Sequence, residues 1–113
     1  MKIINENNSE ILADEIIVAD NFFTRLKGLM FRKSLEEKLA MLIYPCNSVH
    51  TFFMKFPLDI VFLSKEYEVL HIIENMMPRK ISPYIRKTKS VLELPAGVIK
   101  NTKTKKGDFL KIY

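Results

Sequence analysis

One apolar segment near the middle of the chain constrains the fold more than any other. Leu58 to Leu63 (LDIVFL) is short and rich in β-branched and aromatic side chains, which is typical of a strand and not of a helix. Pro57 stands before it, and proline has no N–H to donate to a strand ladder, so it marks a strand start, a bulge or an edge. The segment therefore predicts a strand buried on both faces of a sheet.

Asp59 is the one acid inside this apolar segment. A buried carboxylate must be paired, hydrogen-bonded or protonated, because leaving it bare is costly. The favoured interpretation is structural: Asp59 accepts hydrogen bonds from backbone N–H or hydroxyl groups and holds a turn or a neighbouring strand. The alternative is that Asp59 faces a pocket, where burial would perturb its pKa and mark a functional site.

The residues before Pro57 contain other side chains suited to chemistry. Cys46, the single cysteine, and His50 lie close in sequence to an aromatic run that includes Met54. Cys46 and His50 are acceptable metal ligands, but a structural zinc site needs four ligands, so we expect no metal. No motif for a phosphate loop, a zinc protease or a nucleophile elbow is present, and we expect no cofactor.

Short apolar segments separated by polar or proline-containing turns recur along the chain, and they predict strands at residues 2–5, 15–19, 40–44, 68–74, 90–94 and 109–113. Asp20 or Asn21 can cap a helix that carries apolar residues at helical spacing up to Met30. We therefore predict a mostly β (α+β) fold. It is a compact, single-domain, β-barrel-like sheet of short strands with one short helix near the N-terminus, and the last strand closes the sheet.

The chain of 113 residues is long enough for one hydrophobic core and predicts a single domain. A single cysteine rules out an internal disulfide and fits a reducing cytosol. The first residues lack the apolar segment of a secretory signal, and no apolar run is long enough to span a bilayer. These features predict a cytoplasmic protein without a transmembrane segment.

Positive charge is concentrated in the C-terminal third. Residues 79–113 hold ten lysines and arginines and two acids, Glu93 and Asp108, for a net charge of +8, whereas the rest of the chain carries −3. Such asymmetry can mark a surface for nucleic acid, anionic lipid or an acidic protein. Lysines outnumber arginines and no basic-aromatic motif accompanies them, so solvated loop lysines are the favoured explanation. Nucleic acid is disfavoured as a partner but is not excluded.

Five short motifs occur in an order and spacing that together are specific. They are Arg25 to Met30 (RLKGLM), Cys46 to Met54 (CNSVHTFFM), Pro57 to Phe62 (PLDIVF), Leu92 to Gly97 (LELPAG) and Gly107-Asp108. In this combination the chain strongly resembles the bacterial and archaeal family called domain of unknown function 192. The commonest central motif of that family has Trp before the Met and Asn-Thr after it. Phe53 and Lys55-Phe56 stand there in this chain, which resembles the variant that contains His-Thr.

The resemblance implies a compact β-rich domain with a small helical part and no established activity. It places the recurring polar positions of the family on Arg25, Asp59, Glu93 and Asp108, with His50 and Thr51 in this variant. Because the planar guanidinium of arginine pairs with carboxylates bidentately, we predict an ion pair between Arg25 and either Asp59 or Glu93.

These observations favour a small binding or accessory module over an enzyme. Its pocket would lie near the central motif, for an unidentified small molecule or protein partner, and its candidate binding residues are Arg25, His50, Thr51, Met54, Asp59 and Glu93. A barrel mouth lined by such side chains is a usual pocket location, although most apolar side chains simply fill a core. The alternative is a small hydrolase-like enzyme that uses Asp59 and His50 as acid, base or nucleophile-activating groups.

Overall fold

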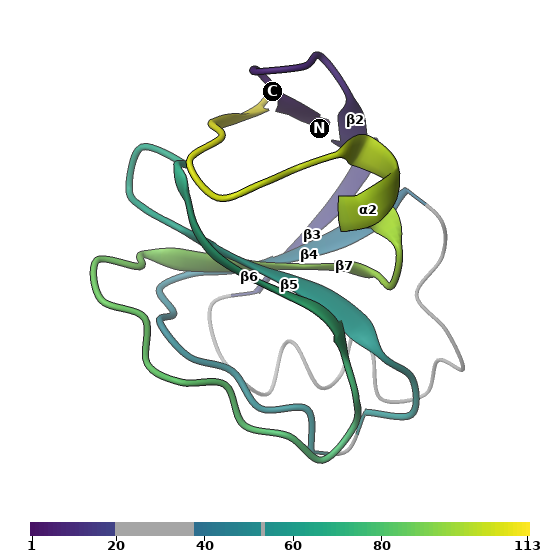
Figure 1. Ribbon diagram of the computed structural model, residues 1–113, viewed down its shortest axis with the longest axis vertical. Coiled ribbons are helices and arrows are strands. Elements are labelled where there is room, and N and C mark those ends of the chain that lie inside the picture. The colour runs from purple at the N-terminus through teal and green to yellow at the C-terminus, as the bar shows by residue number, and fades with distance from the viewer. Residues whose placement is uncertain (20–37, 53) are drawn as a thin grey trace.

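A five-stranded sheet forms the centre of the computed structural model, which describes residues 1–19, 38–52 and 54–113. Its strands, in spatial order, are β3 (Glu15–Ala19), β4 (Leu39–Ile43), β7 (Ser90–Pro95), β5 (Leu58–Leu63) and β6 (Val69–Met76). The β3–β4 pair is parallel and the other pairs are antiparallel. Every residue of β4 and β5 is buried, because these inner strands are covered on both faces (Figure 1).

A smaller sheet covers one face of the five-stranded sheet. It contains β2 (Ile11–Ala13), β1 (Ile3–Asn5) and β8 (Leu110–Ile112) in that order, all antiparallel. The helix α2 (Val98–Thr102) lies beside it, and both ends of the chain come together in this sheet (Figure 1). Their shared core, which we call the helix-side core, includes Leu12, Val61, Leu92 and Ile99.

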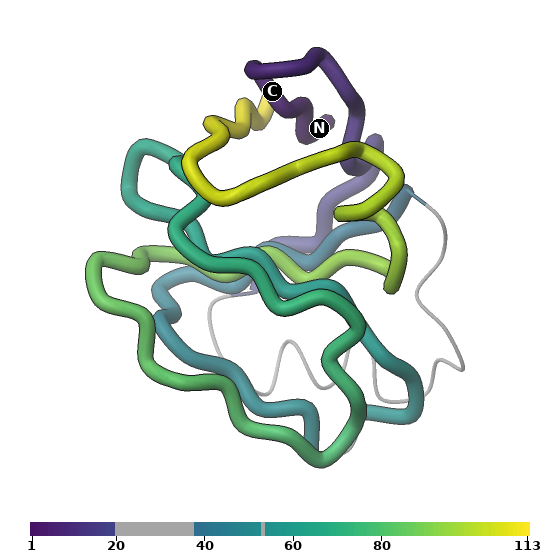
Figure 2. The backbone as a smooth tube through the Cα atoms, viewed as in Figure 1, coloured from purple at the N-terminus to yellow at the C-terminus, as the bar shows by residue number. Residues whose placement is uncertain are grey.

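The opposite face of the five-stranded sheet is covered by two long connections, residues 46–56 and 77–89. We call them the loop pair, because they run beside each other (Figure 2). The core beneath them, the loop-side core, includes Met41, Met54, Ile60 and Phe62. Side chains alternate between the two faces of a strand, which is why neighbouring residues of β5 belong to different cores.

The strand predictions are largely confirmed, and β5 has the predicted bounds. The barrel prediction is wrong, because the strands form two separate sheets. The last strand also does not close the main sheet, since β8 pairs with β1. The predicted N-terminal helix falls on residues 20–37, outside the described residues. Within the part of the chain that the structure describes, the one helix is α2, near the C-terminus.

Candidate functional site

Asp59 accepts hydrogen bonds from two segments of backbone, the end of β6 and the start of α2. Its side chain is fully buried, and Oδ1 accepts a hydrogen bond from the Asn75 N–H at 2.8 Å. Oδ2 accepts hydrogen bonds from the N–H groups of Gly97 and Ile99, each at 3.0 Å. The two Oδ2 bonds hold the Pro95–Gly97 turn and the first turn of α2 against β5, and the Oδ1 bond holds the end of β6. Gly97 has a φ of 100°, a backbone conformation that residues with a Cβ rarely adopt.

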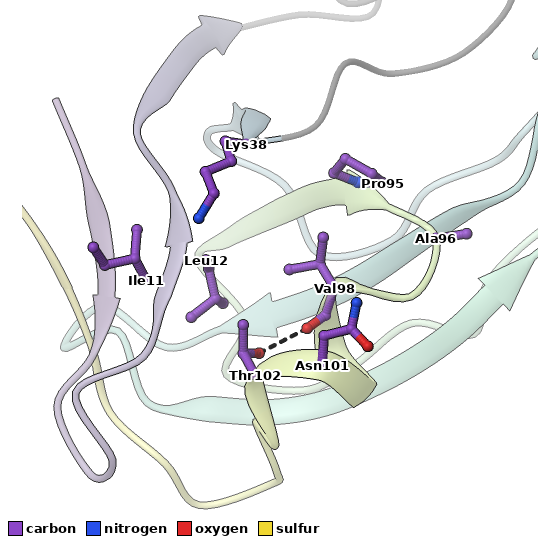
Figure 3. Close-up of a pocket in the computed structure, with 8 residues that line it drawn as sticks. All are labelled: Ile11, Leu12, Lys38, Pro95, Ala96, Val98, Asn101 and Thr102. Carbon is purple, nitrogen blue, oxygen red and sulfur yellow. Dashed lines mark hydrogen bonds between the residues drawn. The ribbon is translucent and has the colours of Figure 1, made fainter.

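A cleft of about 340 Å³ opens on the far side of this turn. Residues of β2, α2 and the connections around them line it (Figure 3): Ile11, Leu12, Lys38, Pro95, Ala96, Val98, Asn101 and Thr102. Leu12 is buried and provides an apolar floor. The Lys38 side chain extends toward Leu12, while Asn101 lies on the α2 side of the cleft (Figure 3). The cleft therefore combines a cation, an amide and apolar walls.

The electrostatics of the cleft depend on Lys38, which is exposed. Among the described residues, no carboxylate lies within ion-pair distance of its Nζ. The Thr102 hydroxyl is already engaged, since its Oγ1 donates to the Val98 carbonyl at 2.8 Å. Lys38 Nζ and the Asn101 amide are thus the polar side-chain groups that the cleft offers to a ligand.

Thr51 joins the two halves of the loop pair. It is fully buried, and its Oγ1 donates to the Met77 carbonyl at 2.6 Å and accepts from the Lys80 N–H at 2.9 Å. Its backbone N–H donates to the Lys80 carbonyl, and its carbonyl accepts from the Arg79 N–H. Through these hydrogen bonds Thr51 links the two connections of the loop pair, which is a structural role.

The family follows from a comparison with known proteins. The family called domain of unknown function 192, described as "Uncharacterized ACR", matches residues 3–112. The chain belongs to this family. The function of the family is not known.

Archaeal relatives match the chain over nearly its whole length. A UPF0127 protein of Pyrococcus horikoshii is 31% identical, and the match covers 98% of each chain. A UPF0127 protein of Pyrococcus furiosus is 30% identical, with 96% of each chain covered.

Two bacterial crystal structures have the same fold. A protein of unknown function from Novosphingobium aromaticivorans superposes with a TM-score of 0.81 at 24% identity, covering 98% of this chain and 82% of the other. A protein of Sinorhizobium meliloti described as a putative transcription regulator gives a TM-score of 0.79 at 25% identity, covering 97% and 89%.

Among the described residues, the predicted polar positions do not gather at one place. Asp59 points into the helix-side core, whereas Glu93 is fully buried on the loop-side face, where its register partners are Met41 and Ile60. Met54 belongs to the loop-side core. Arg25, with its predicted ion pair, lies outside the described residues. The structure therefore does not unite Asp59 and Glu93 in one pocket.

His50 and Cys46 lie in the loop pair. The His50 ring is half-buried, 5.1 Å from the Phe52 ring between centroids. The Cys46 thiol donates to the Ser48 carbonyl at 3.0 Å. Since Asp59 faces the other side of the sheet, the structure does not bring it together with His50. Among the described residues, no group of three or more His, Cys, Asp or Glu side chains forms a metal-binding cluster.

Asp108 anchors a second buried polar network near the small sheet. Its Oδ2 accepts hydrogen bonds from Asn5 Nδ2 at 2.9 Å and from the Lys105 N–H at 3.0 Å, and Lys105 Nζ lies 3.1 Å from Oδ1. Burial by itself raises the pKa of Asp108, but the hydrogen bonds from Asn5 and Lys105 and the Lys105 charge outweigh it and lower the pKa below its ordinary value. Asn5 and Asp108 are far apart in sequence, so this network joins the two ends of the chain.

Sequence reasoning missed Lys38, Val98 and Asn101 in the cleft. Lys38 lies in a polar stretch with nothing to single it out, and its φ of 66° is invisible in the sequence. Val98 and Asn101 belong to α2, whose five residues are too few for a helical period to stand out. The Leu94-Pro95-Ala96-Gly97 motif was the available clue, because it precedes α2 and two of its residues line the cleft.

Proposed function

We propose that the protein is a small binding module whose site is the cleft between β2 and α2. Its ligand is a small molecule that joins an anionic group, a carboxylate or a phosphate, to an apolar group. The observation that carries this proposal is the placement of Asp59, which accepts hydrogen bonds from Gly97 and Ile99 and so holds the turn that carries the cleft residues Ala96 and Val98. Sites built on rigid supports bind with less loss of entropy.

The size and lining of the cleft support a small ligand. Its volume of about 340 Å³ is at the lower end of the range for small-molecule sites. Such sites combine apolar walls with a few polar groups that orient the ligand. Here Leu12 and Val98 supply the apolar contact, and the Asn101 amide can donate to an anion or accept from a hydroxyl.

The charge of Lys38 supports an anionic group on the ligand. A lysine ammonium is a compact cation with three donors, well suited to a carboxylate or a phosphate. The cleft lies at the Asp59 end of the central motif and on the other side of the sheet from His50 and Met54. A cytoplasmic location for this module stays a prediction from the sequence.

A thermal-shift series tests the proposal. The probes are octanoate, phenylacetate and phenyl phosphate, each compared with an uncharged alcohol of similar shape. A ligand that binds only the folded state raises the melting temperature. We expect a rise with at least one anionic probe and a smaller rise with its alcohol. The proposal fails if none of the anionic probes stabilises the protein.

Lys38→Met is the variant that isolates the site. Lys87→Met is its matched control, because Lys87 is also an exposed lysine with a left-handed backbone conformation, a φ of 68° against 66°. Lys87 lies in the loop pair, on the other side of the sheet. We expect Lys38→Met to abolish the response to the anionic probe and Lys87→Met to keep it. Equal responses in the two variants would place the binding site elsewhere.

A further inference from the structure

Hydrogen bonds join the two connections of the loop pair into an outer layer from Cys46 to Thr51. The N–H of Cys46 donates to the Lys89 carbonyl, and the Asn47 carbonyl accepts from the Ile85 N–H. Further along, the Val49 carbonyl accepts from the Ser82 N–H, and Thr51 forms the bonds described above. The layer is therefore a defined surface, and it lies on the opposite face of the five-stranded sheet from the cleft.

This layer carries positive charge alone. Its lysines and arginines are all exposed: Lys55, Arg79, Lys80, Arg86, Lys87 and Lys89. None of the thirteen acids of the chain falls within residues 46–56 or 77–89. The positive potential of the layer is thus not neutralised by acids of its own segments, and it favours an anionic partner.

Large apolar side chains are exposed in the same layer. Ile81 is 70% exposed, Tyr84 65%, Met77 49% and Phe52 40%. Ile81 pairs with His50 in an isolated bridge, and the ring of His50 packs against Phe52, so part of this apolar surface is contiguous. Such patches mark interaction sites. Ile81 follows directly after Arg79 and Lys80, which places apolar and cationic groups side by side.

We propose that the loop pair docks on the surface of an anionic phospholipid bilayer. Lysine and arginine are attracted to acidic headgroups, while exposed apolar side chains insert at the boundary with the acyl chains. Ile81, the most exposed of these side chains, favours a bilayer over nucleic acid as the occupant. Proteins that bind single strands stack bases on aromatic rings, and Ile81 and Met77 offer no ring, although Phe52 and Tyr84 do. The cytoplasmic leaflet of a cell membrane carries the required negative charge.

Vesicle co-sedimentation with the full chain tests the proposal. We expect binding to vesicles of phosphatidylcholine mixed with phosphatidylserine, none to phosphatidylcholine alone, and loss of binding as salt is raised. The double variant Arg79→Gln/Lys80→Gln should bind about thirtyfold more weakly, given the usual contribution of each cation near a charged bilayer. Lys103→Gln/Lys106→Gln, which removes two exposed lysines outside the loop pair, should bind like the wild type.

A fluorescent reporter then tests insertion. The chain has no tryptophan, so Ile81→Trp adds a single one at an exposed position. We expect its emission to shift to the blue with the anionic vesicles, whereas Tyr113→Trp on the small sheet should not shift. Absence of binding to anionic vesicles overturns the proposal, as does equal loss in the two double variants. Salt-sensitive binding of duplex DNA without vesicle binding, or dimerisation through the loop pair, would also overturn it.

Discussion

Asp59 and Glu93 lie on adjacent strands, β5 and β7, but point to opposite faces of the five-stranded sheet. In the β5–β7 register Asp59 is paired with Leu94, and Glu93 is paired with Ile60. Because side chains alternate along each strand, the two acids enter different cores. One guanidinium cannot lie beside both carboxylates.

The ion pair predicted for Arg25 should therefore involve only one of these acids. Double-mutant cycles of unfolding free energy, with Arg25→Met combined with Asp59→Asn or with Glu93→Gln, measure each coupling directly. We expect a coupling of about 1 kcal/mol or more in one cycle and none in the other. Coupling in both cycles would contradict the opposite orientation of the acids, and coupling in neither would reject the ion pair.

Asp59→Asn should destabilise the fold. Asparagine has one acceptor oxygen where Asp59 has two, so at least one of the three N–H bonds to Asn75, Gly97 and Ile99 is lost. We expect a loss of about 1–3 kcal/mol in unfolding free energy, the usual cost of an unsatisfied buried group, measured by urea denaturation. Asp14→Asn, at an exposed acid, should change it by less than about 0.5 kcal/mol. A stable Asp59→Asn variant would show that these bonds are dispensable.

Thr51→Val should loosen the loop pair. The substitution keeps the shape of the side chain and removes the hydroxyl that bonds to Met77 and Lys80. We expect a loss of about 1–3 kcal/mol and faster hydrogen exchange of the Lys80 amide. Thr88→Val is the control, because the buried Thr88 hydroxyl has no hydrogen-bond partner among the described residues. The structural role of Thr51 is wrong if the two variants behave alike.

Acid should weaken the fold partly through Asp108. Its pKa is lower in the folded protein than the ordinary value of 3.8, so its carboxylate stabilises the folded state fully above the unfolded pKa. This stabilisation is lost as the pH falls through the folded pKa. We expect the difference in unfolding free energy between wild type and Asp108→Asn to be largest near neutral pH. The difference should shrink as the pH falls below about 4. A difference that is constant with pH would assign the effect to packing.

The strands could be predicted from the sequence wherever their burial shows as a run of apolar, β-branched or aromatic residues. The bounds of β5 were predictable because Leu58 to Leu63 is apolar, β-branched and introduced by Pro57. The prediction that Asp59 accepts hydrogen bonds from backbone N–H groups is confirmed by its bonds to Asn75, Gly97 and Ile99. In contrast β2 (Ile11–Ala13) is too short to show alternation.

The cleft could not be read from the sequence, because tertiary contacts create it. Lys38, Asn101 and Leu12 are distant along the chain, and they meet only when α2 lies beside the small sheet. The separation of the two sheets has the same origin. The two sheets are separate because β8 pairs with β1, and no local sequence pattern indicates this long-range pairing.

An acid beside the cleft gives a prediction of opposite sign. The Asp14 N–H donates to the Lys38 carbonyl, so Asp14 lies next to Lys38. The exposed carboxylate of Asp14 reduces the positive potential around Lys38. Asp14→Asn should therefore strengthen the binding of an anionic probe, by up to about fivefold for an exposed charge. Titration calorimetry with phenyl phosphate at low salt measures the change. Weaker binding in this variant would contradict the electrostatic role given to Lys38.

Amide NMR titration with phenyl phosphate tests the central claim most directly, since it locates the binding site residue by residue. We expect chemical-shift changes at the amides of Lys38, Ala96 and Asn101 in the wild type, and none at the amides of Thr51 and Lys80 in the loop pair. In the same titration of Lys38→Met, the chemical shifts of the cleft amides should not change. Shifts confined to the loop pair, or no shifts at all, would contradict a ligand site between β2 and α2.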